Sequence, residues 1–471
     1  MRVRFAILTA ALAASSAAAA ADEAELLRRL EQQQRQIEDL QKQVHDMAAI
    51  LANRVAKVEA QTAEGKVAMT SPTARVESSG GDFSLQVVGT LQPTFAAYRQ
   101  SRRGPRAPQL EDGTEVRRAH LGVQGTAFRD VAYVLVLDGA AGGGVASAVR
   151  DATIQYTGLR PFTITLGNQK PQAGFDSSFS DRSNAQIFLE PALPAELMNP
   201  QSARFIGARV SSGGERYSAS VGLFGDDIAN SGIANPVRDG WGVHGRLTLA
   251  PINAAGRLLH VGASGYWRRP PLGRATPADP PTPQLRFRAR PEAAVDGQRL
   301  VDTGNLGFAR SFAAGGAELA VVWGALGLQS EYVAARVSQS GGRTTLDFDG
   351  GYVGLSYALT GESRTYDGRN GTFGRFRPAR NLDPRAGAWG AWEVAARLST
   401  IDLNDAANDL ARGGVRGGRE TNLTLGINWH LSPFTRLMAN YIRAEASNLT
   451  NTGLDEGTNA DIFGFRVHQE W

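Results

Sequence analysis

Strand-length segments in which apolar and polar residues alternate are the feature that most limits how this chain can fold. Residues 118–124 read RAHLGVQ, and residues 242–249 and 422–430 repeat the pattern. A period of two places the apolar side chains on one face of a strand and the polar ones on a wet face. No stretch after the N-terminus has the roughly 18 uncharged apolar residues that a membrane helix needs. The alternation predicts strands throughout residues 83–471.

The kind of residue at the strand ends favours a membrane barrel over a soluble sandwich. Trp241, Trp267, Trp429 and Tyr441 belong to the apolar parity, as an interfacial girdle requires. Short turns such as 129–130, 159–161 and 432–433 alternate with long connections. A count of the alternating segments predicts about sixteen strands. An even number of strands joined by alternating short and long turns is typical of bacterial outer-membrane barrels. We therefore predict an all-β transmembrane barrel of antiparallel strands with a water-filled lumen.

The last strand supports a barrel that ends at the C-terminus. Trp471, Val467, Phe465 and Phe463 occupy alternate positions, and Gln469 is the polar exception among them. An aromatic terminus of this kind resembles the signal that the barrel-assembly machinery reads, so that machinery is a predicted partner. The final strand is expected to pair with the first one near residue 83, which leaves both ends in the periplasm.

Three further units precede the barrel. Arg2 and Arg4, an apolar run and a terminal Ala19-Ala20-Ala21 predict a signal peptide over 1–21. Residues 22–64 repeat apolar residues at heptad a and d positions, which predicts an α-helical coiled coil in the periplasm. The a and d residues are Leu26, Leu30, Ile37, Leu40, Val44, Met47, Leu51 and Val58, with polar Gln33 and Arg54 between them. Residues 65–82 are small and polar, so we interpret them as a linker. The chain has no cysteine, so no disulfide supports the exported fold.

Several runs resemble the porin O/P family of phosphate- and polyphosphate-selective porins. They include RRAHLGVQGT at 117–126, FTITLGNQKP at 162–171, FLEPALP at 188–194 and RLMANYI at 436–442, in the expected order along the barrel. The resemblance implies a sixteen-stranded homotrimeric barrel in which inward-folded segments carry cationic side chains. Phosphate or polyphosphate is the substrate class that it implies.

The long segment after Gly167 is the first candidate for a pore constriction. It runs far beyond the length of a barrel hairpin and carries Lys170, Arg182 and Arg204. Lysine is rare in this chain, and Lys170 is the only one in the predicted barrel. An ammonium group binds phosphate as a compact charge, whereas a guanidinium offers a planar fork of donors. An ordinary solvated lysine is the alternative interpretation.

Two other arginine clusters lie in long connections. Arg286, Arg288 and Arg290 share one parity and would line one face of an extended segment. A third cluster between Arg364 and Arg385 contains Arg375 and Arg377, in a turn that strand counting places in the periplasm. Such a long periplasmic turn is expected to fold up into the lumen. Arg118 and Arg246, on the polar faces of strands, complete the predicted pore-lining set.

These clusters predict a passive diffusion channel for small anions, with phosphate or polyphosphate as the first candidates. Rings of Arg or Lys are the usual device of anion pores, because several weak sites in a row let an ion enter and leave. A general porin for sugars or other anions is the alternative in the same class, and an envelope tether acting through the coiled coil is a structural one. Lipopolysaccharide phosphates are alternative partners for the arginines.

Chemistry of other kinds has little support in the sequence. The six histidines are scattered without metal-ligand spacing, and the chain has no nucleophile elbow or phosphate-binding P-loop. We therefore predict no catalytic residues, no metal, no cofactor and no nucleic-acid partner.

Overall fold

The computed structural model describes residues 42, 46, 49, 66–68, 73, 75–141, 148–178, 185–198, 200, 204–226, 228, 240–273, 281–448 and 456–471. The chain divides into two compact units, residues 1–66 and 67–471, and the second unit is the subject below. The predicted signal peptide lies outside the described residues. So does the predicted coiled coil, apart from Lys42, Asp46 and Ala49, which are helical. The coiled coil therefore stays a prediction.

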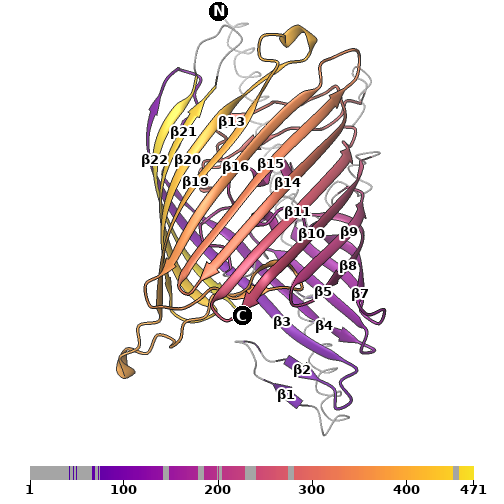
Figure 1. Ribbon diagram of the computed structural model, residues 1–471, viewed down its shortest axis with the longest axis vertical. Coiled ribbons are helices and arrows are strands. Elements are labelled where there is room, and N and C mark those ends of the chain that lie inside the picture. The colour runs from indigo at the N-terminus through magenta and orange to yellow at the C-terminus, as the bar shows by residue number, and fades with distance from the viewer. Residues whose placement is uncertain are drawn as a thin grey trace, which may run out of the picture. The chain divides into compact units, whose positions relative to one another are not determined.

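Sixteen antiparallel strands form a closed barrel, which confirms the barrel part of the predicted fold class (Figure 1). Successive strands along the chain are hydrogen-bonded neighbours in the wall. The barrel strands are β3 (Ser84–Arg102), β4 (Gly113–Ala127), β5 (Val131–Asp138), β6 (Val149–Tyr156), β7 (Phe162–Gln169), β8 (Phe205–Gly213), β9 (Tyr217–Phe224), β10 (Trp241–Ala254), β11 (Arg257–Arg269), β14 (Ala309–Trp323), β15 (Leu326–Gln339), β16 (Leu346–Ala358), β19 (Ala391–Asp405), β20 (Val415–His430), β21 (Thr435–Ser447) and β22 (Thr458–Glu470).

Smaller elements occupy the connections. They are β1 (Lys66–Ala68), β2 (Arg75–Glu77), β12 (Arg288–Ala289), β13 (Val301–Asp302), β17 (Tyr366–Asp367), β18 (Thr372–Phe373), α3 (Ala195–Met198) and the 3-10 helices η1 (Asp176–Ser178), η2 (Pro384–Ala386) and η3 (Leu410–Arg412). β2 pairs with the start of β3, so a part of the predicted linker is a strand. No helix among the described residues is long and apolar enough to cross a membrane.

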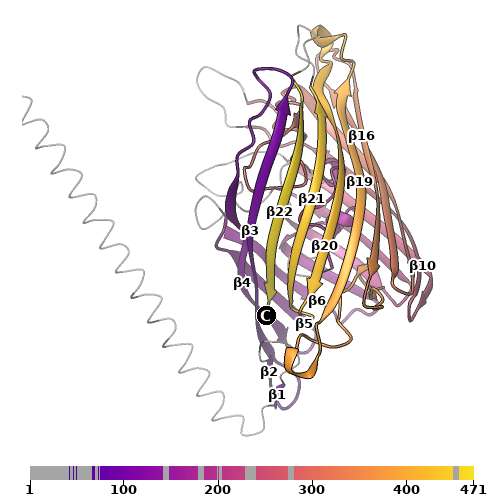
Figure 2. The ribbon, with the colours of Figure 1, turned by 90° about the vertical axis from the view of Figure 1, so that its left-hand side faces the viewer.

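The barrel closes between its first and last strands. β22 pairs with β3 from Thr458↔Arg102 to Glu470↔Thr90, and the two strands lie side by side in Figure 2. Beyond this ladder, Gly89 and Trp471 exchange backbone hydrogen bonds of 2.9 and 3.2 Å. Closure satisfies the backbone groups that an open edge would expose to lipid. The predicted pairing of the chain's last strand with its first is therefore confirmed.

Gly89 is the position where this closure tolerates no side chain. A Cβ atom on Gly89 would lie 2.2 Å from the indole ring of Trp471. We expect Gly89→Val to displace the terminal indole and to lower the yield of folded, heat-modifiable barrel on electrophoresis. Gly265, where an added Cβ meets nothing within 4 Å, provides the matched control as Gly265→Val. An equal yield from the two variants would contradict the role given to the terminal contact.

The two ends of the barrel differ in the length of their connections. Residues 128–130, 157–161, 214–216, 255–256, 324–325 and 431–434 form short turns at one end. The opposite end carries the long connections 103–112, 170–204 and 270–308. Short turns face the periplasm in bacterial outer-membrane barrels. The end that carries the short turns is therefore the periplasmic end, and the end that carries the long connections is the outer end. The connection 359–390 is the one long segment among the described turns of the periplasmic end.

Alternation along each strand separates a lipid face from a lumen face. On β20 the outward Leu423 and Ile427 are 43% and 49% exposed, whereas the inward Asn422 and Asn428 are fully buried. The apolar parity thus points outward, as predicted. The polar parity points inward but contacts protein, because chain segments fill much of the lumen. The expected water-filled lumen is therefore wrong for these positions.

Candidate functional site

Three long connections fold into the barrel and supply the atoms that fill it. We name them segment A (170–204), segment B (270–308) and segment C (359–390). Phe188 of segment A, Phe287 of segment B and Phe376 of segment C are at most 1% exposed. The barrel wall also hydrogen-bonds their backbone, since Asn428 donates to the Ile187 carbonyl at 2.9 Å. The prediction that the periplasmic connection folds inward is confirmed by the contacts of segment C given below.

Arg397 of β19 joins segments A and B inside the barrel. Its guanidinium lies 2.6 Å from the Glu292 carboxylate of segment B and 3.7 Å from the Asp176 carboxylate of segment A. It also donates to the Glu190 carbonyl at 3.1 Å and lies 4.4 Å from the centre of the Phe188 ring. Burial raises the pKa of Asp176, and the neighbouring Arg397 opposes that shift. A single buried cation therefore holds two segments to the wall.

The carboxylate of Glu190 in segment A binds a second group of arginines. Arg117 of β4 binds its carboxylate through two N–H groups at 2.8 and 3.0 Å, and Arg466 of β22 does so at 2.7 Å. Arg118 also acts on this carboxylate electrostatically. Burial alone would raise the pKa of Glu190, but the guanidiniums of Arg117 and Arg466 outweigh it and hold the pKa well below its usual range. Glu190 is therefore an anchor of segment A.

Segment C enters from the periplasmic end and meets segment A. Arg364 of segment C binds the buried Glu393 carboxylate of β19 at 2.7 Å and donates to the Ala185 carbonyl of segment A at 2.9 Å. Phe376 stacks on His430 of β20 with ring centres 4.1 Å apart. Outer and periplasmic segments thus touch within the lumen, which narrows any path through the barrel.

Most of the predicted pore-lining arginines are already held by the protein. The pairs are Arg118 with Gln92, Arg204 with Asp151, Arg246 with Glu318, Arg286 with Asp302 and Arg375 with Glu470. Arg246 shows the strength of such a clamp, because it forms two bonds of 2.7 and 2.8 Å to Glu318 and donates to the backbone of segment C. Arg204, Arg246, Arg286 and Arg375 each form an ion pair with a carboxylate, and Arg118 interacts electrostatically with Glu190.

The other predicted residues have different surroundings. Lys170 is half-buried at the start of segment A and acts electrostatically on Asp176. Arg377 is exposed in the turn that segment C forms at the periplasmic end. Arg182 lies outside the described residues. Two residues of the predicted set, Arg288 and Arg290, lie close to a third arginine, Arg299.

The charges of Arg288, Arg290 and Arg299 in segment B all act on the carboxylate of Glu196 in α3. Phe287 and Ala289, the neighbours of Arg288 on either side, are fully buried, so the predicted single parity holds at this strand. Nε of Arg290 and both Nε and Nη1 of Arg299 are buried without a hydrogen-bond acceptor. Burial and the neighbouring Arg290 lower the pKa of Arg299 to about 10, while burial raises the pKa of Glu196. We call these three residues the arginine cluster.

The match to known families agrees with this architecture. Residues 98–467 match the family described as phosphate-selective porin O and P. The chain belongs to this porin family. As a porin, it is a channel protein of the outer membrane.

Individual proteins share between about a tenth and a third of their residues with this chain. Porin O of Pseudomonas aeruginosa is 26% identical over 451 residues, which cover 88% of this chain and 96% of that protein. An uncharacterized protein of Caulobacter vibrioides is 31% identical over 403 residues, covering 83% of this chain and 75% of its own length. Among solved structures, outer-membrane expressed OmpT of Vibrio cholerae shares 10% identity, with a TM-score of 0.49 over 86% of this chain and 100% of its own.

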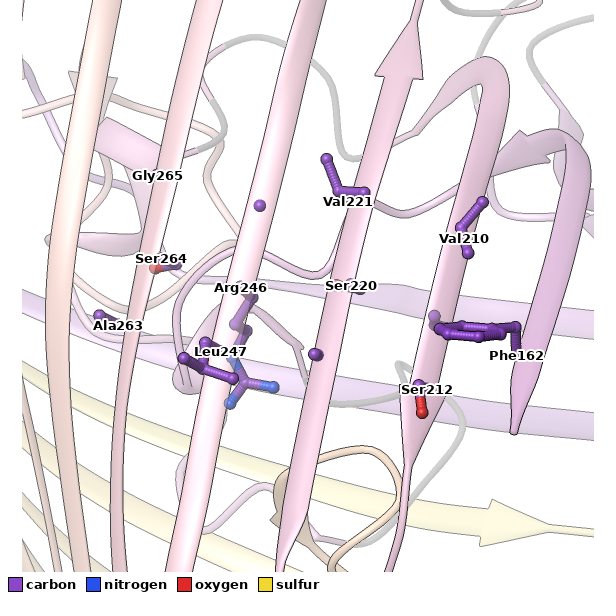
Figure 3. A pocket seen from close by; sticks show the side chains of 13 residues that line it. Phe162, Val210, Ser212, Ser220, Val221, Arg246, Leu247, Ala263, Ser264 and Gly265 are labelled. Atoms are coloured by element: carbon purple, nitrogen blue, oxygen red, sulfur yellow. The ribbon is translucent and has the colours of Figure 1, made fainter. Parts of the chain in front are cut away.

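A cavity of about 620 Å³ opens on the outer wall of the porin rather than in its lumen (Figure 3). Outward-facing Phe162, Val210 and Val221 line it, and each is 40% or more exposed. Ala219 and Gly245 add little bulk between them. Arg246 and Ser264 also border it, but the surface that it exposes is mainly apolar and faces away from the pore, so we assign it no part in the passage of ions. Within the described part of the chain, no group of three His, Asp or Glu side chains could hold a metal ion.

Sequence reasoning missed two arginines that the porin places in its lumen. Arg397 and Arg466 lie on the inward parity of their strands, so strand alternation alone could have identified them as lumen-facing. Arg299, in contrast, belongs to the same arginine-rich connection of the sequence as Arg288 and Arg290, but its approach to Arg290, just before β13, could not be predicted from spacing. For each of these arginines, the sequence pattern could not identify the carboxylate on which it acts.

Proposed function

We propose that this porin is a passive diffusion channel for anions, with phosphate or polyphosphate as the preferred substrates. The arginine cluster is the observation that carries this proposal. In it the charges of three guanidinium groups act on one carboxylate, and buried N–H donors of Arg290 and Arg299 have no acceptor. An unsatisfied buried donor costs about 1–3 kcal/mol, and more when it is charged. A phosphate oxygen is a strong acceptor for such groups.

The paired arginines suit the same function in another way. Their carboxylates cancel most of the lumen charge, so the cluster forms a local excess of positive charge rather than one deep anion trap. Conduction requires binding that favours entry and still permits exit. The match to a phosphate-selective family supports phosphate as the first substrate to test. A general porin for sugars or other anions is the alternative.

Planar-bilayer recording of the purified porin tests the proposal. In a potassium chloride gradient the reversal potential is expected to show anion selectivity, and millimolar phosphate is expected to block the chloride current. Anion selectivity without a phosphate block would remove phosphate and leave a general anion porin. A reversal potential that shows no preference for chloride over potassium would overturn the proposal.

Glu196 should control the strength of the arginine cluster. We expect Glu196→Gln to increase anion selectivity at neutral pH, because a carboxylate on which all three arginines act is neutralised. The raised pKa of Glu196 means that it takes up a proton at a higher pH than an ordinary glutamate. Acidification should therefore increase anion selectivity in the natural porin and leave the variant unchanged. Reversal potentials between pH 4 and 8 measure this, and parallel pH profiles would contradict it.

The wall of the porin also supports the homotrimer that the family resemblance implies. Strands β5–β9 have eight or nine residues, whereas the long strands from β10 onward have 13 to 16. A membrane strand needs about 9–11 residues, so β5–β9 are at or just below the length that crosses a bilayer, whereas the later strands exceed it. All seven tryptophans, the typical residues of the interfacial belt, lie beyond residue 240. We propose that the β5–β9 face, with the cavity beside it, packs against other copies of the chain.

Cysteine cross-linking tests this face, because the chain contains no cysteine of its own. Leu166 on β7 and Leu355 on β16 both point outward and are 52% and 47% exposed. We expect Leu166→Cys to give covalent oligomers with a short bis-maleimide in membranes and Leu355→Cys to stay monomeric on denaturing gels. The reverse result would place the interface on the opposite wall.

Several expectations from the sequence complete the proposal. We propose that the signal peptide directs export, that the barrel-assembly machinery binds the final strand, and that the coiled coil over 22–64 lies in the periplasm. Lipopolysaccharide is the expected lipid partner at the outer rim. The tether role remains the structural alternative, and it predicts that deletion of residues 22–64 weakens the envelope without changing conductance.

A further inference from the structure

The tip of segment C, residues 377–389, forms an ordered turn at the periplasmic end of the barrel. Asp383 and Ala388 exchange backbone hydrogen bonds of 2.8 and 2.9 Å, and the Asp383 side chain accepts from the first amides of η2. Leu382 donates to the Leu431 carbonyl at 2.7 Å, which fixes the turn to the β20–β21 connection. In Figure 1 the turn projects beyond the strand ends at the lower left. Hydrogen bonds therefore hold the turn in a defined conformation outside the lumen.

Aromatic residues mark the level at which this turn leaves the wall. Trp392 of β19 and Trp429 of β20 stack with ring centres 4.9 Å apart, and the indole N–H of Trp429 donates to the Trp389 carbonyl at 2.7 Å. Trp389 itself is 59% exposed. Tryptophans of this kind lie at the headgroup level of a membrane. The turn beside them thus emerges where the phosphates of the inner leaflet lie.

The charge on the turn is positive and is not cancelled by ion pairs. Arg377, Arg380 and Arg385 are all exposed, and Asp383 is the only acidic residue among 377–389. Arg380 donates to the Ala386 carbonyl at 3.0 Å, a neutral acceptor that leaves its charge in place. The described residues form no ion pair with any of the three, whereas Arg364 and Arg375 of the same segment are paired with Glu393 and Glu470.

We propose that the turn 377–389 is a binding site for anionic phospholipid headgroups of the inner leaflet. The three arginines would bind the phosphate, while Trp389 lies at the boundary between headgroups and acyl chains. Each arginine near an anionic membrane surface strengthens binding by about fivefold. The site holds the periplasmic end of the porin at the membrane surface and is independent of the anions that pass through the lumen.

Native mass spectrometry of the detergent-solubilised full-length porin tests this site. Dioleoyl phosphatidylglycerol is titrated, with dioleoyl phosphatidylcholine as the zwitterionic reference. We expect the natural porin to retain phosphatidylglycerol preferentially, and the variant Arg377→Gln/Arg380→Gln/Arg385→Gln to bind it at least about tenfold more weakly. Replacement of the same arginines by lysine should restore most of the preference, because the charge returns.

A matched change of charge at the outer end provides the control. The variant Arg343→Gln/Arg412→Gln/Arg419→Gln loses three positive charges and should retain phosphatidylglycerol like the natural porin. Equal retention by the turn variant and the natural porin, or equal loss in the control, overturns the proposal. So does displacement of the lipid by 10 mM inorganic phosphate, which would identify a site for free phosphate. If the arginines instead govern retention on purified cell-wall sacculi and leave lipid binding unchanged, the partner is the wall.

Discussion

Replacement of Arg397 by methionine is expected to release segments A and B from the barrel wall and to increase single-channel conductance severalfold. Methionine keeps the approximate length of the side chain but removes the charge. The carboxylates of Asp176 and Glu292 then lose the guanidinium that lies 3.7 and 2.6 Å away. Breaking a buried ion pair by removal of one partner costs about 3–5 kcal/mol. The strand ladders do not depend on Arg397, so the barrel itself should remain folded.

Two measurements separate a released plug from an unfolded protein. Heat-modifiable migration on electrophoresis should show an intact barrel, and limited proteolysis should cut segments A and B faster than in the natural porin. Arg336→Met is the matched control, because Arg336 pairs with Asp347 on the exposed outer face, where both side chains are more than half exposed. Exposed pairs contribute about 0–1 kcal/mol. Normal conductance in the Arg397 variant would show that other contacts suffice to hold the segments.

A third variant tests whether the charge imbalance or the lost contact opens the lumen. Adding Asp176→Asn and Glu292→Gln to Arg397→Met removes the uncompensated carboxylates while keeping their shapes. Replacing a whole buried ionic group is often much less costly than removing one member of it. We therefore expect the triple variant to recover most of the natural conductance. Continued high conductance would assign the effect to the lost hydrogen bond to Glu190 and the contact with Phe188.

The barrel could be predicted because its signal is periodic and local. Alternation in residues such as Asn422 and Leu423 assigns each side chain to a face without knowledge of its neighbours. The same logic placed Arg288 and Arg290 on one side of segment B. It also indicated that the long periplasmic turn folds inward, since an unsupported turn of that length is unusual.

The site could be predicted only in part because charge compensation is not local. Asp176, Glu292 and Arg397 meet across more than 200 residues of sequence, and a single sequence carries no record of such a long-range contact. The arginine count therefore overstated the positive charge of the lumen. Arg204 and Arg246 are neutralised by Asp151 and Glu318, although nothing in their spacing indicates a partner.

Conversion of the arginine cluster to glutamines is expected to abolish most of the anion selectivity. The variant is Arg288→Gln/Arg290→Gln/Arg299→Gln. A unit charge about 6 Å from a passing ion contributes about 1.4 kcal/mol at an effective dielectric constant of about 40. That energy corresponds to about a tenfold change in the ratio of anion to cation permeability. Three cations opposed by Glu196 should therefore change the ratio by at least about tenfold in bilayers, and the phosphate block should disappear.

A lysine series distinguishes charge from geometry at the same positions. Arg288→Lys/Arg290→Lys/Arg299→Lys keeps three cations, so anion selectivity should persist, but the phosphate block should weaken because the planar fork of donors is lost. Neither series should destabilise the barrel, since the buried N–H groups of Arg290 and Arg299 have no acceptors to lose. If the glutamine variant keeps the natural reversal potential, selectivity resides elsewhere in the lumen. Lys170, at the start of segment A, would then be the next residue to replace, because its charge lies beside the Asp176 that Arg397 holds.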